Sequence, residues 1–287
     1  MQLGPIQTGY VTVNQRRINT RAQFHIERLA GGSVAGQSKV DLFNLSTATR
    51  NWIETNPARN KVITVFAGYN GDDRNIFQGN YSLVTTDRDG TELKTSIQCA
   101  DGVSLWQGAH VEFSGAADDD QVYGQVVEQL AAFGIVKGHY SATVQAAFAG
   151  RTYGARPCSD SGLVGHIMDN LVRRHGFKYA VENGTLNIYD PKHYEDQDEF
   201  FLSKDTGLVG FPSKTGTDAA GGIYKITSLF NPELTAGRKI LVKSAAFEDV
   251  TELKINSLIH TGDTWRGGGK TEMECVPLGA RGFLVVQ

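Results

Sequence analysis

The C-terminal fifth of the chain, residues 222–276, alternates apolar and polar residues with the period of two that is typical of half-buried strands. The alternation predicts four short strands, around Ile223–Thr227, Ile240–Ser244, Leu253–Ser257 and Met273–Pro277. Asn231-Pro232, Gly237 and the glycine run 267–269 supply turns between them. Because such a meander leaves its edge strands unpaired, we expect the strands either to close into a barrel or to pair with another chain.

Composition narrows the protein class. A chain of 287 residues is near the size at which a single core gives way to two or three domains. Its 33 glycines and its charged content of 21% favour turns and short strands over long helices. The net charge of −3 gives no basic surface, which argues against a sequence-reading nucleic-acid binder but leaves passive contact with DNA open.

The three cysteines, Cys99, Cys158 and Cys275, are widely spaced and odd in number. They can form neither a disulfide framework nor a CxxC metal site, so we expect buried thiols in a protein made in a reducing compartment. The N-terminal residues 1–14 lack the basic region and apolar core of a signal peptide. Apolar runs stay shorter than the roughly 18 residues of a membrane-spanning helix, so no membrane span is expected.

The first region, residues 1–113, is predicted to consist almost entirely of strands. Expected strands lie at 23–27, 38–45, 61–67, 76–86 and 92–100. The segment 61–67 is apolar enough for burial on both faces or for the interior of a tight barrel. One short helix is predicted over 46–54. The run Asp87–Gly90 suggests a calcium loop, but Gln98 stands where the bidentate glutamate is needed, so a β-hairpin is the preferred interpretation.

The middle region, residues 114–199, changes to a helical period. A first helix is predicted after the acidic run 118–120, and it carries an apolar stripe of Val122, Val126, Val127, Leu130 and Phe133, closed by Gly134. A second helix is predicted from Ser159 or Ser161 to a basic last turn at 173–175, with Gly176 after it. Asn183-Gly184 then marks the turn of a β-hairpin spanning 177–189. Residues 189–205 are expected to be a linker, and 206–222 a flexible loop.

Two separated motifs in the C-terminal region carry a resemblance. The run Ser228–Leu234 with Gly237 and Arg238, followed by His260–Trp265 and Thr271–Val276, resembles the C-terminal region of baseplate hub proteins of contractile-tailed bacteriophages. These hubs are related to the upper part of type VI secretion spikes. The motif residues are Ser228, Leu229, Phe230, Asn231, Pro232, Gly237, His260, Gly262, Asp263 and Trp265. The middle helix and hairpin are similar to the α+β domain inserted in such hubs, although generic adaptor and peptidoglycan-binding modules share that local pattern.

The resemblance implies a mainly β fold with an α+β insertion. Two tail-tube-like β-barrel domains, 1–113 and 200–287, would flank a middle helix–helix–β-hairpin domain at 114–199, and the barrels could exchange strands. It also implies a homotrimer in the virion, at the tail baseplate, assembled in the host cytoplasm. The trimer would join the tail tube to the central spike, meet baseplate wedge or tape-measure components, adapt sixfold to threefold symmetry, and let DNA pass. Glu272 and Glu274 are candidates for an acidic lumen that repels phosphates.

The sequence offers no catalytic, cofactor or metal site. Its histidines, His25, His110, His139, His166, His175, His193 and His260, form no HxH, HExxH or Cys/His cluster. His260 and Asp263 hint at acid–base work, but a turn in which Asp263 accepts from backbone amides is preferred. Gly269-Lys270-Thr271 fails as a phosphate loop, because Thr264 stands at the position of the required glycine. The alternative function is a tail-associated cell-wall hydrolase or peptidoglycan-binding protein, and the missing catalytic set argues against the hydrolase.

Overall fold

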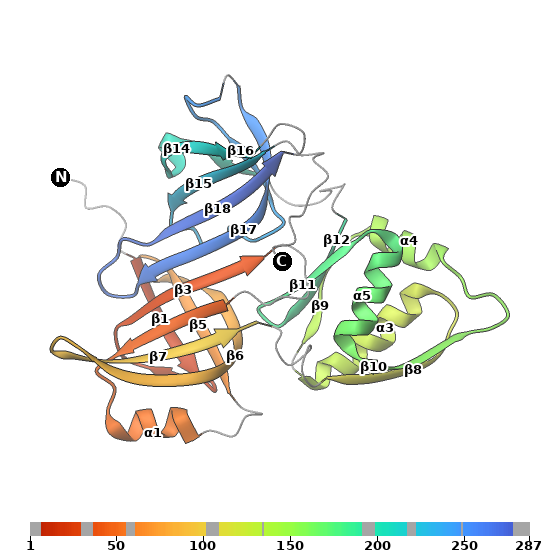
Figure 1. The fold of residues 1–287 in the computed structure, drawn as a ribbon, viewed down its shortest axis with the longest axis horizontal. Coiled ribbons are helices and arrows are strands. Elements are labelled where there is room, and N and C mark those ends of the chain that lie inside the picture. Colours follow the sequence, from red (N-terminus) through yellow and green to blue (C-terminus); the bar gives the residue numbers. More distant parts are fainter. Residues whose placement is uncertain are drawn as a thin grey trace. The chain divides into compact units, whose positions relative to one another are not determined.

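The structure is a computed structural model that describes residues 7–29, 37–55, 61–101, 109–133, 135–190, 199–216, 222–247 and 249–277. The described residues divide into two compact units (Figure 1). The first, the sheet unit, combines the N-terminal segments up to residue 101 with 199–277. The second, the α+β unit, consists of residues 109–190. None of the described helices is long and apolar enough to span a membrane.

The sheet unit holds thirteen strands in one sheet, with the order β14-β15-β18-β17-β3-β4-β7-β6-β5-β1-β2, while β16 pairs with β17 and β13. The N-terminal strands are β1 (Gln7–Val13), β2 (Arg16–Ile18), β3 (Ala22–Leu29), β4 (Gln37–Phe43), β5 (Val62–Tyr69), β6 (Asp72–Asp89) and β7 (Glu92–Ala100). The C-terminal strands are β13 (Phe200–Leu202), β14 (Leu208–Thr215), β15 (Ile223–Leu229), β16 (Lys239–Val242), β17 (Thr251–Asp263) and β18 (Lys270–Pro277). Two short helices, α1 (Thr47–Thr55) and the 3-10 helix η3 (Lys204–Thr206), complete the unit.

The expectation of two β-barrels is corrected: the described strands form one continuous sheet and close no barrel. The cause is β17, which is long enough to have two partners on one edge. Its first residues, Thr251–Lys254, pair with β16, and its last seven, Ser257–Asp263, pair with Gln23–Leu29 of β3. A bulge between Ile255 and Ser257 in the pairing with β18 separates the two stretches. One strand therefore joins the N-terminal and C-terminal strands of the unit.

Two apolar cores lie against this sheet. The N-terminal strands enclose one core, which contains Val11, Phe24, Val40 and Ile97, and the C-terminal strands enclose another around Ile240. The expected helix is confirmed as α1, and Ser46 caps it by accepting a hydrogen bond from the Thr49 amide (3.2 Å). The expected hairpin at Asp89-Gly90 is confirmed as the β6–β7 turn. In contrast, β5 alternates buried and half-buried residues, so it is not buried on both faces.

The expected flexible loop at 206–222 is wrong over Leu208–Thr215, which forms β14 and pairs with β15. A register shift between Val209 and Ser213 accommodates the run Gly210-Phe211-Pro212, where Gly210 has φ of 70°. A bulge of this kind lets glycine and proline occur in an edge strand, which is why composition alone suggests a loop. Residues 217–221 of the expected loop and 191–198 of the expected linker lie outside the described residues, whereas Phe200–Leu202 at the linker's end forms β13.

The described residues of the α+β unit form three α-helices and one 3-10 helix, packed with two small sheets (Figure 1). Its elements are β8 (His110–Ala116), α3 (Asp119–Leu130), the 3-10 helix η2 (Ala131–Phe133), β9 (Val136–Tyr140), α4 (Ala142–Gly150), β10 (Cys158–Leu163), α5 (Val164–His175), β11 (Lys178–Glu182) and β12 (Thr185–Tyr189). Strand β8 pairs with β10, and β9 runs parallel to β12, which pairs in turn with β11. Val126, Phe148, Met168 and Ile188 are buried in its core.

The predicted helices of this unit are present with one changed boundary. Asp118 caps α3 by accepting from the Gln121 amide (2.8 Å), and α5 ends at Gly176 with φ of 72°. However, α5 begins at Val164, because residues 158–163 pair with β8 as strand β10. Helix α4 and strands β9 and β10 were not expected. The hairpin is confirmed as β11 and β12, joined through Asn183 and Gly184, which have φ of 53° and 74°.

The cysteines behave as predicted at two of three positions. All three are free thiols; Cys99 and Cys275 are buried, and Cys158 is partly exposed. Burial raises the pKa of the Cys99 thiol to about 12, with a further contribution from the charge of Asp101. Burial likewise raises the pKa of Cys275. These two thiols are therefore protonated and unreactive at neutral pH, as expected for side chains that fill an apolar core.

Candidate functional site

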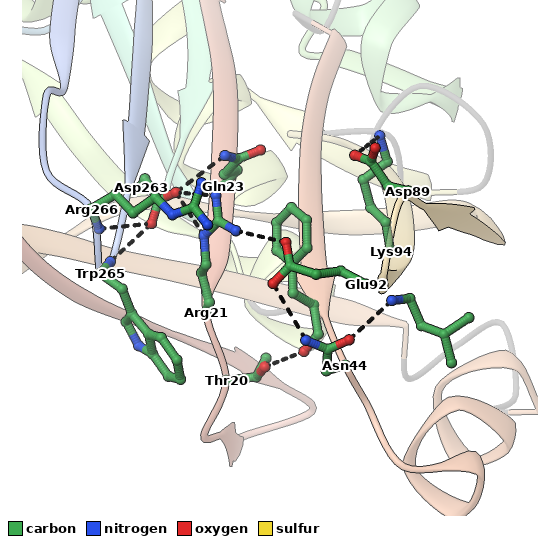
Figure 2. A network of polar contacts seen from close by, with 12 residues as sticks. Thr20, Arg21, Gln23, Asn44, Asp89, Glu92, Lys94, Asp263, Trp265 and Arg266 are labelled. Atoms are coloured by element: carbon green, nitrogen blue, oxygen red, sulfur yellow. Dashed lines mark hydrogen bonds and ion pairs between the residues drawn. The ribbon is translucent and has the colours of Figure 1, made fainter.

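Three motif residues of the C-terminal region, Phe230, His260 and Asp263, lie where the hairpin of β17 and β18 meets the N-terminal strands. Asp263, the last residue of β17, lies at the centre of a polar network (Figure 2). Its Oδ2 accepts hydrogen bonds from Nε of Arg21 (2.9 Å) and from Nε2 of Gln23 (3.1 Å). Its Oδ1 accepts from the backbone amides of Trp265 (2.9 Å) and Arg266 (3.0 Å). One carboxylate thus fixes both the turn that follows β17 and the neighbouring strand β3.

These contacts determine the charge of Asp263. Burial tends to raise the pKa of the carboxyl, but hydrogen bonds from Arg21, the two backbone amides and Gln23 outweigh it and hold the pKa below its usual value. Thr264 adds a second connection to β3, because it accepts from the Ala22 amide through Oγ1 (3.0 Å) and donates its own amide to the Ala22 carbonyl (2.9 Å). The turn is therefore held by an ionised side chain and by backbone pairing.

Arg21 extends the network to the β6–β7 hairpin (Figure 2). Its Nη2 lies 2.8 Å from Asp263 and its Nη1 lies 3.1 Å from Glu92, while the guanidinium lies 4.3 Å from the centre of the Phe43 ring. The hydrogen bond to Asp263 raises the pKa of Arg21 despite its burial. We call Arg21, Gln23, Glu92 and Asp263 the Asp263 clasp. It joins segments separated by up to 242 positions in sequence.

Phe230 forms an apolar counterpart to the clasp. It follows β15, yet its side chain is buried in the core of the N-terminal strands. Its ring lies 5.7 Å from that of Phe24, 6.1 Å from Tyr69 and 5.5 Å from His260. Phe230 therefore inserts a C-terminal side chain into the N-terminal core, and burial of an aromatic ring supplies a large apolar contact there.

His260 is buried beside Phe230 and is not poised for catalysis. Its Nε2 lies 3.2 Å from the Leu234 carbonyl, which can only accept, so Nε2 carries the proton. Its Nδ1 must then accept from the Thr271 hydroxyl (2.9 Å). Burial, together with the charge of Arg28, lowers the pKa of His260 to about 3, against a small opposing effect of the Leu234 carbonyl. The imidazole is neutral, and the preferred turn at Asp263 is confirmed over acid–base work.

The remaining motif residues lie in turns and strand pairings of the C-terminal region. The Asn231 side chain accepts from the Glu233 amide (2.8 Å), beside a half-buried Pro232, in the predicted turn. Gly237 has φ of 85° and donates its amide to Ile255 (2.8 Å). Ser228 is buried and donates to the Leu229 carbonyl (2.9 Å), and Gly262 pairs with Phe24 across β17 and β3. Leu229 and Trp265 differ from the rest, since both side chains are exposed.

Glu272 and Glu274 lie on one face of β18, opposite the buried residues Thr271, Met273 and Cys275. Each glutamate has a lysine partner: Lys270 lies 2.9 Å from Glu272, and Lys225 lies 3.5 Å from Glu274. The predicted shared face is present, but its charges are compensated. An uncompensated acidic stripe does not form along this part of β18.

The clasp partners were missed in the sequence. Arg21, Gln23 and Glu92 carry no motif. Nothing local indicates that Arg21 and Gln23 meet a carboxylate 240 or more positions away, or that Glu92 pairs with Arg21. Asp119 in the α+β unit was expected only as an acid at a helix start. It is fully buried, and its carboxylate accepts from the Tyr153 hydroxyl and lies 2.7 Å from Nε2 of His175 and 3.4 Å from Nη1 of Arg174. Among the described residues, no three His, Cys, Asp or Glu side chains could together hold a metal ion.

Comparison with known proteins identifies the fold. No protein-family model matches the sequence, and no curated protein matches it either. The structure is similar to a tail protein from Neisseria meningitidis (9% identity, TM-score 0.64), covering 96% of this chain and 98% of the other. It is also similar to a 43 kDa tail protein of prophage MuSo2 from Shewanella oneidensis (10% identity, TM-score 0.61). That alignment covers 95% of this chain and 99% of the other.

A third similar structure is an E. coli component of the type VI secretion system, itself described as similar to T4 bacteriophage tail proteins. Its identity is 11% and its TM-score 0.58, and the alignment covers 99% of this chain and 78% of the other. The chain therefore has the fold of phage tail proteins and of type VI spike proteins. The resemblance to baseplate hub proteins is confirmed at the level of the fold.

Proposed function

We propose that this chain is a structural phage tail protein, the baseplate hub that joins the tail tube to the central spike. The observation that carries the proposal is the single sheet that runs through both the N-terminal and the C-terminal strands by way of β17. Tail proteins of similar fold align over nearly their whole length, which supports a role in the same kind of assembly. A structural, non-enzymatic role is also supported by the two buried contacts, which join the N-terminal and C-terminal strands of the sheet unit.

The proposed mechanism is mechanical. A hub under tension between tube and spike must not separate along its own joint. Here the joint between β17 and β3 consists of seven antiparallel residue pairs. The Asp263 clasp lies at one end of it, and Phe230 packs against Phe24 within it. Backbone hydrogen bonds, an ion pair and a buried aromatic ring would then all resist separation of β17 from β3.

Symmetry adaptation follows if the protein is a homotrimer. Each copy contributes one set of N-terminal strands and one set of C-terminal strands, so three copies would present six strand sets to a sixfold tube and three chains to a threefold spike. The proposed domains are 1–113 with the N-terminal strands, 114–199 as the middle part, and 200–287 with the C-terminal strands. The proposed partners are the tail tube protein, the central spike protein, and baseplate wedge or tape-measure components, in the virion tail.

The face of β18 that carries Glu272 and Glu274 is our candidate for the channel lining. Because Lys270 and Lys225 pair with these glutamates, we revise the acidic-lumen hypothesis. A compensated surface presents little net charge, and ion pairs on it are screened further by salt. DNA passing such a face would be neither strongly attracted nor strongly repelled.

The first test is the native mass in solution, measured by light scattering over a range of concentrations. A trimer has a mass of 93.6 kDa, three times the chain mass of 31.2 kDa. A trimer that forms rings in electron micrographs supports the hub. A strict monomer, both alone and with a co-expressed tail tube protein, contradicts it. A zymogram on bacterial cell walls tests the alternative, since clear lysis would identify a wall hydrolase.

A further inference from the structure

Trp265 is an exposed aromatic side chain on a fixed backbone. It is 68% exposed, and in Figure 2 its indole extends away from the Asp263 clasp. The backbone beneath it is held by the Asp263 carboxylate and by Thr264 pairing with Ala22. Rigid exposed tryptophans lose little conformational freedom on binding, and they are enriched among the residues that dominate binding energy at interfaces. A docking role therefore fits Trp265.

A groove of about 570 Å³ lies elsewhere in the same unit, at the other end of β17. We call it the β13 groove, and it is lined mainly by Phe201, Lys204, Asp205, Lys243, Phe247 and Val250. Its apolar lining includes Phe201 and Val250, which are large hydrophobic side chains left exposed. The volume is in the range that accommodates a ligand larger than an indole.

The groove cannot be filled by Trp265 of the same copy. Trp265 follows the C-terminal end of β17, whereas Val250 immediately precedes its N-terminal end. A strand of 13 residues rises by roughly 3.3 Å per residue, which places its ends about 40 Å apart. The two features belong to one unit, so each copy presents both at once. Such a pair suits a head-to-tail contact between different surfaces of two copies.

The charges next to Trp265 and at the β13 groove are also complementary. Within the described residues, the Arg266 guanidinium next to Trp265 has no ion-pair partner, and neither do the carboxylates of Asp205 and Asp249 at the groove. A cation entering beside the indole could pair with either carboxylate. Lys204 and Lys243 share the rim, so the cation is favoured only on the aspartate side, which would fix the orientation of the incoming hairpin.

We propose that Trp265 of one copy docks in the β13 groove of a second copy, with Arg266 beside Asp205 or Asp249. The proposal rests on the proposed hub, because it names the surfaces through which the copies of a ring would meet. Trp265 supplies the buried aromatic group, and Phe201, Phe247 and Val250 supply the apolar walls. The contact is heterologous, so it leaves one free Trp265 and one free groove in any open chain of copies.

The test compares association constants, measured by sedimentation velocity, for wild type, Trp265→Ala, Val250→Asp and a control. The control is Phe211→Ala, which removes an even more exposed ring (76%) from β14 of the same unit. Trp265→Ala and Val250→Asp should each weaken association by ~30-fold or more, the loss expected for a dominant interface residue. Phe211→Ala should stay within about threefold of wild type. All three positions are exposed, so unchanged melting temperatures verify the fold.

A mixture of the two variants is the sharper experiment. Trp265→Ala keeps its groove and Val250→Asp keeps its tryptophan, so mixing restores one contact and should give dimers of 62.4 kDa, twice 31.2 kDa, but no ring. Assembly of Trp265→Ala at the wild-type strength overturns the docking while leaving the hub in place. An equal loss with Phe211→Ala, or no dimer in the mixture, also overturns it. A wild type that never associates instead contradicts the ring itself.

Discussion

Each unit contains one buried carboxylate that joins its own elements, and the two carboxylates do so in different ways. Asp263 in the sheet unit and Asp119 in the α+β unit are both buried and both have arginine partners. Asp263 also accepts hydrogen bonds from the Gln23 side chain of β3 and from the backbone amides of the turn that follows β17. Asp119 lies at the start of α3, accepts a hydrogen bond from the Tyr153 hydroxyl and contacts the His175 ring. The first joins distant strands to each other, and the second joins the start of one helix to the end of another.

The arginine partners of Asp263 and Asp119 differ in how far they are exposed to solvent. The side chains of Arg21 and Asp263 are 7% and 9% exposed, so neither charge reaches water easily. The two arginine partners of Asp119 are different, because Arg151 is 50% exposed and Arg174 is 39% exposed, although His175 beside them is 11% exposed. A buried cation that loses its anionic partner lowers the free energy of unfolding strongly, whereas a half-exposed cation can be hydrated by water in place of its partner. The same chemical change should therefore cost more at Asp263 than at Asp119.

The largest expected effect is that of Asp263→Ala. It leaves the buried Arg21 guanidinium with Glu92 as its remaining ion-pair partner and frees two backbone amides, so we expect the free energy of unfolding of the sheet unit to fall by ~3–5 kcal/mol. Urea unfolding followed by Trp fluorescence measures it. Asp263→Asn is the control, since an amide oxygen can still accept from Trp265 and Arg266 and should recover part of the loss. An effect under about 1 kcal/mol would show that the charge is solvated.

Phe230→Ala tests whether the joint depends as much on packing as on charge. Removing a ring from a closed core leaves a cavity, so we expect the free energy of unfolding of the sheet unit to fall by about 3 kcal/mol. This loss should not depend on salt concentration. Its neighbour Leu229 is exposed, and Leu229→Ala should change stability by less than ~0.5 kcal/mol. Equal small losses at both positions would place the Phe230 ring on the surface, contrary to its contact with Phe24.

Asp119→Ala makes the same chemical change in the α+β unit. We expect a loss of ~1–3 kcal/mol, smaller than for Asp263→Ala, because Arg151 and Arg174 can turn to water while the Tyr153 and His175 contacts are lost. Hydrogen exchange resolved by residue distinguishes the units, and the protection lost should map to α3 and α5. A loss as large as that at Asp263 would contradict the argument from partner exposure.

Acid should weaken the sheet unit through His260. Its pKa is about 3 in the folded state and about 6.5 when unfolded, so between these values only the unfolded chain binds the proton. The free energy of unfolding should then fall by about 1.4 kcal/mol per pH unit as the pH drops below 6.5. Asp263 adds to the loss only below its unfolded pKa, near 3.8. His260→Gln should flatten the slope between pH 6 and 4, and an unchanged slope would exclude His260 as its source.

The sequence predicts local structure well and long-range contacts poorly. The turn at Asp263, the helix that begins in the acidic run 118–120 and the hairpin at Asn183-Gly184 depend on neighbouring residues, and all three are present. The clasp partner Arg21 and the insertion of Phe230 depend on which strands pair, and the alternation pattern does not specify that. Barrel closure was wrong for the same reason, since the length and the bulge of β17 decide the pairing. Strand β14 was missed because its bulge residues have the composition of a loop.

The smallest expected effect is that of Gly184→Val. Gly184 has φ of 74° in the turn between β11 and β12, and a β-branched residue is strained there, so the α+β unit should lose roughly 1 kcal/mol or more. Gly90→Val is the matched control, because Gly90 has φ of 62° in the β6–β7 turn of the sheet unit. Each variant should lower protection from hydrogen exchange in its own unit only. If Gly184→Val also lowered protection across β3 and β17, the two units would unfold together, and the costs at Asp263 and Asp119 could no longer be assigned to separate units.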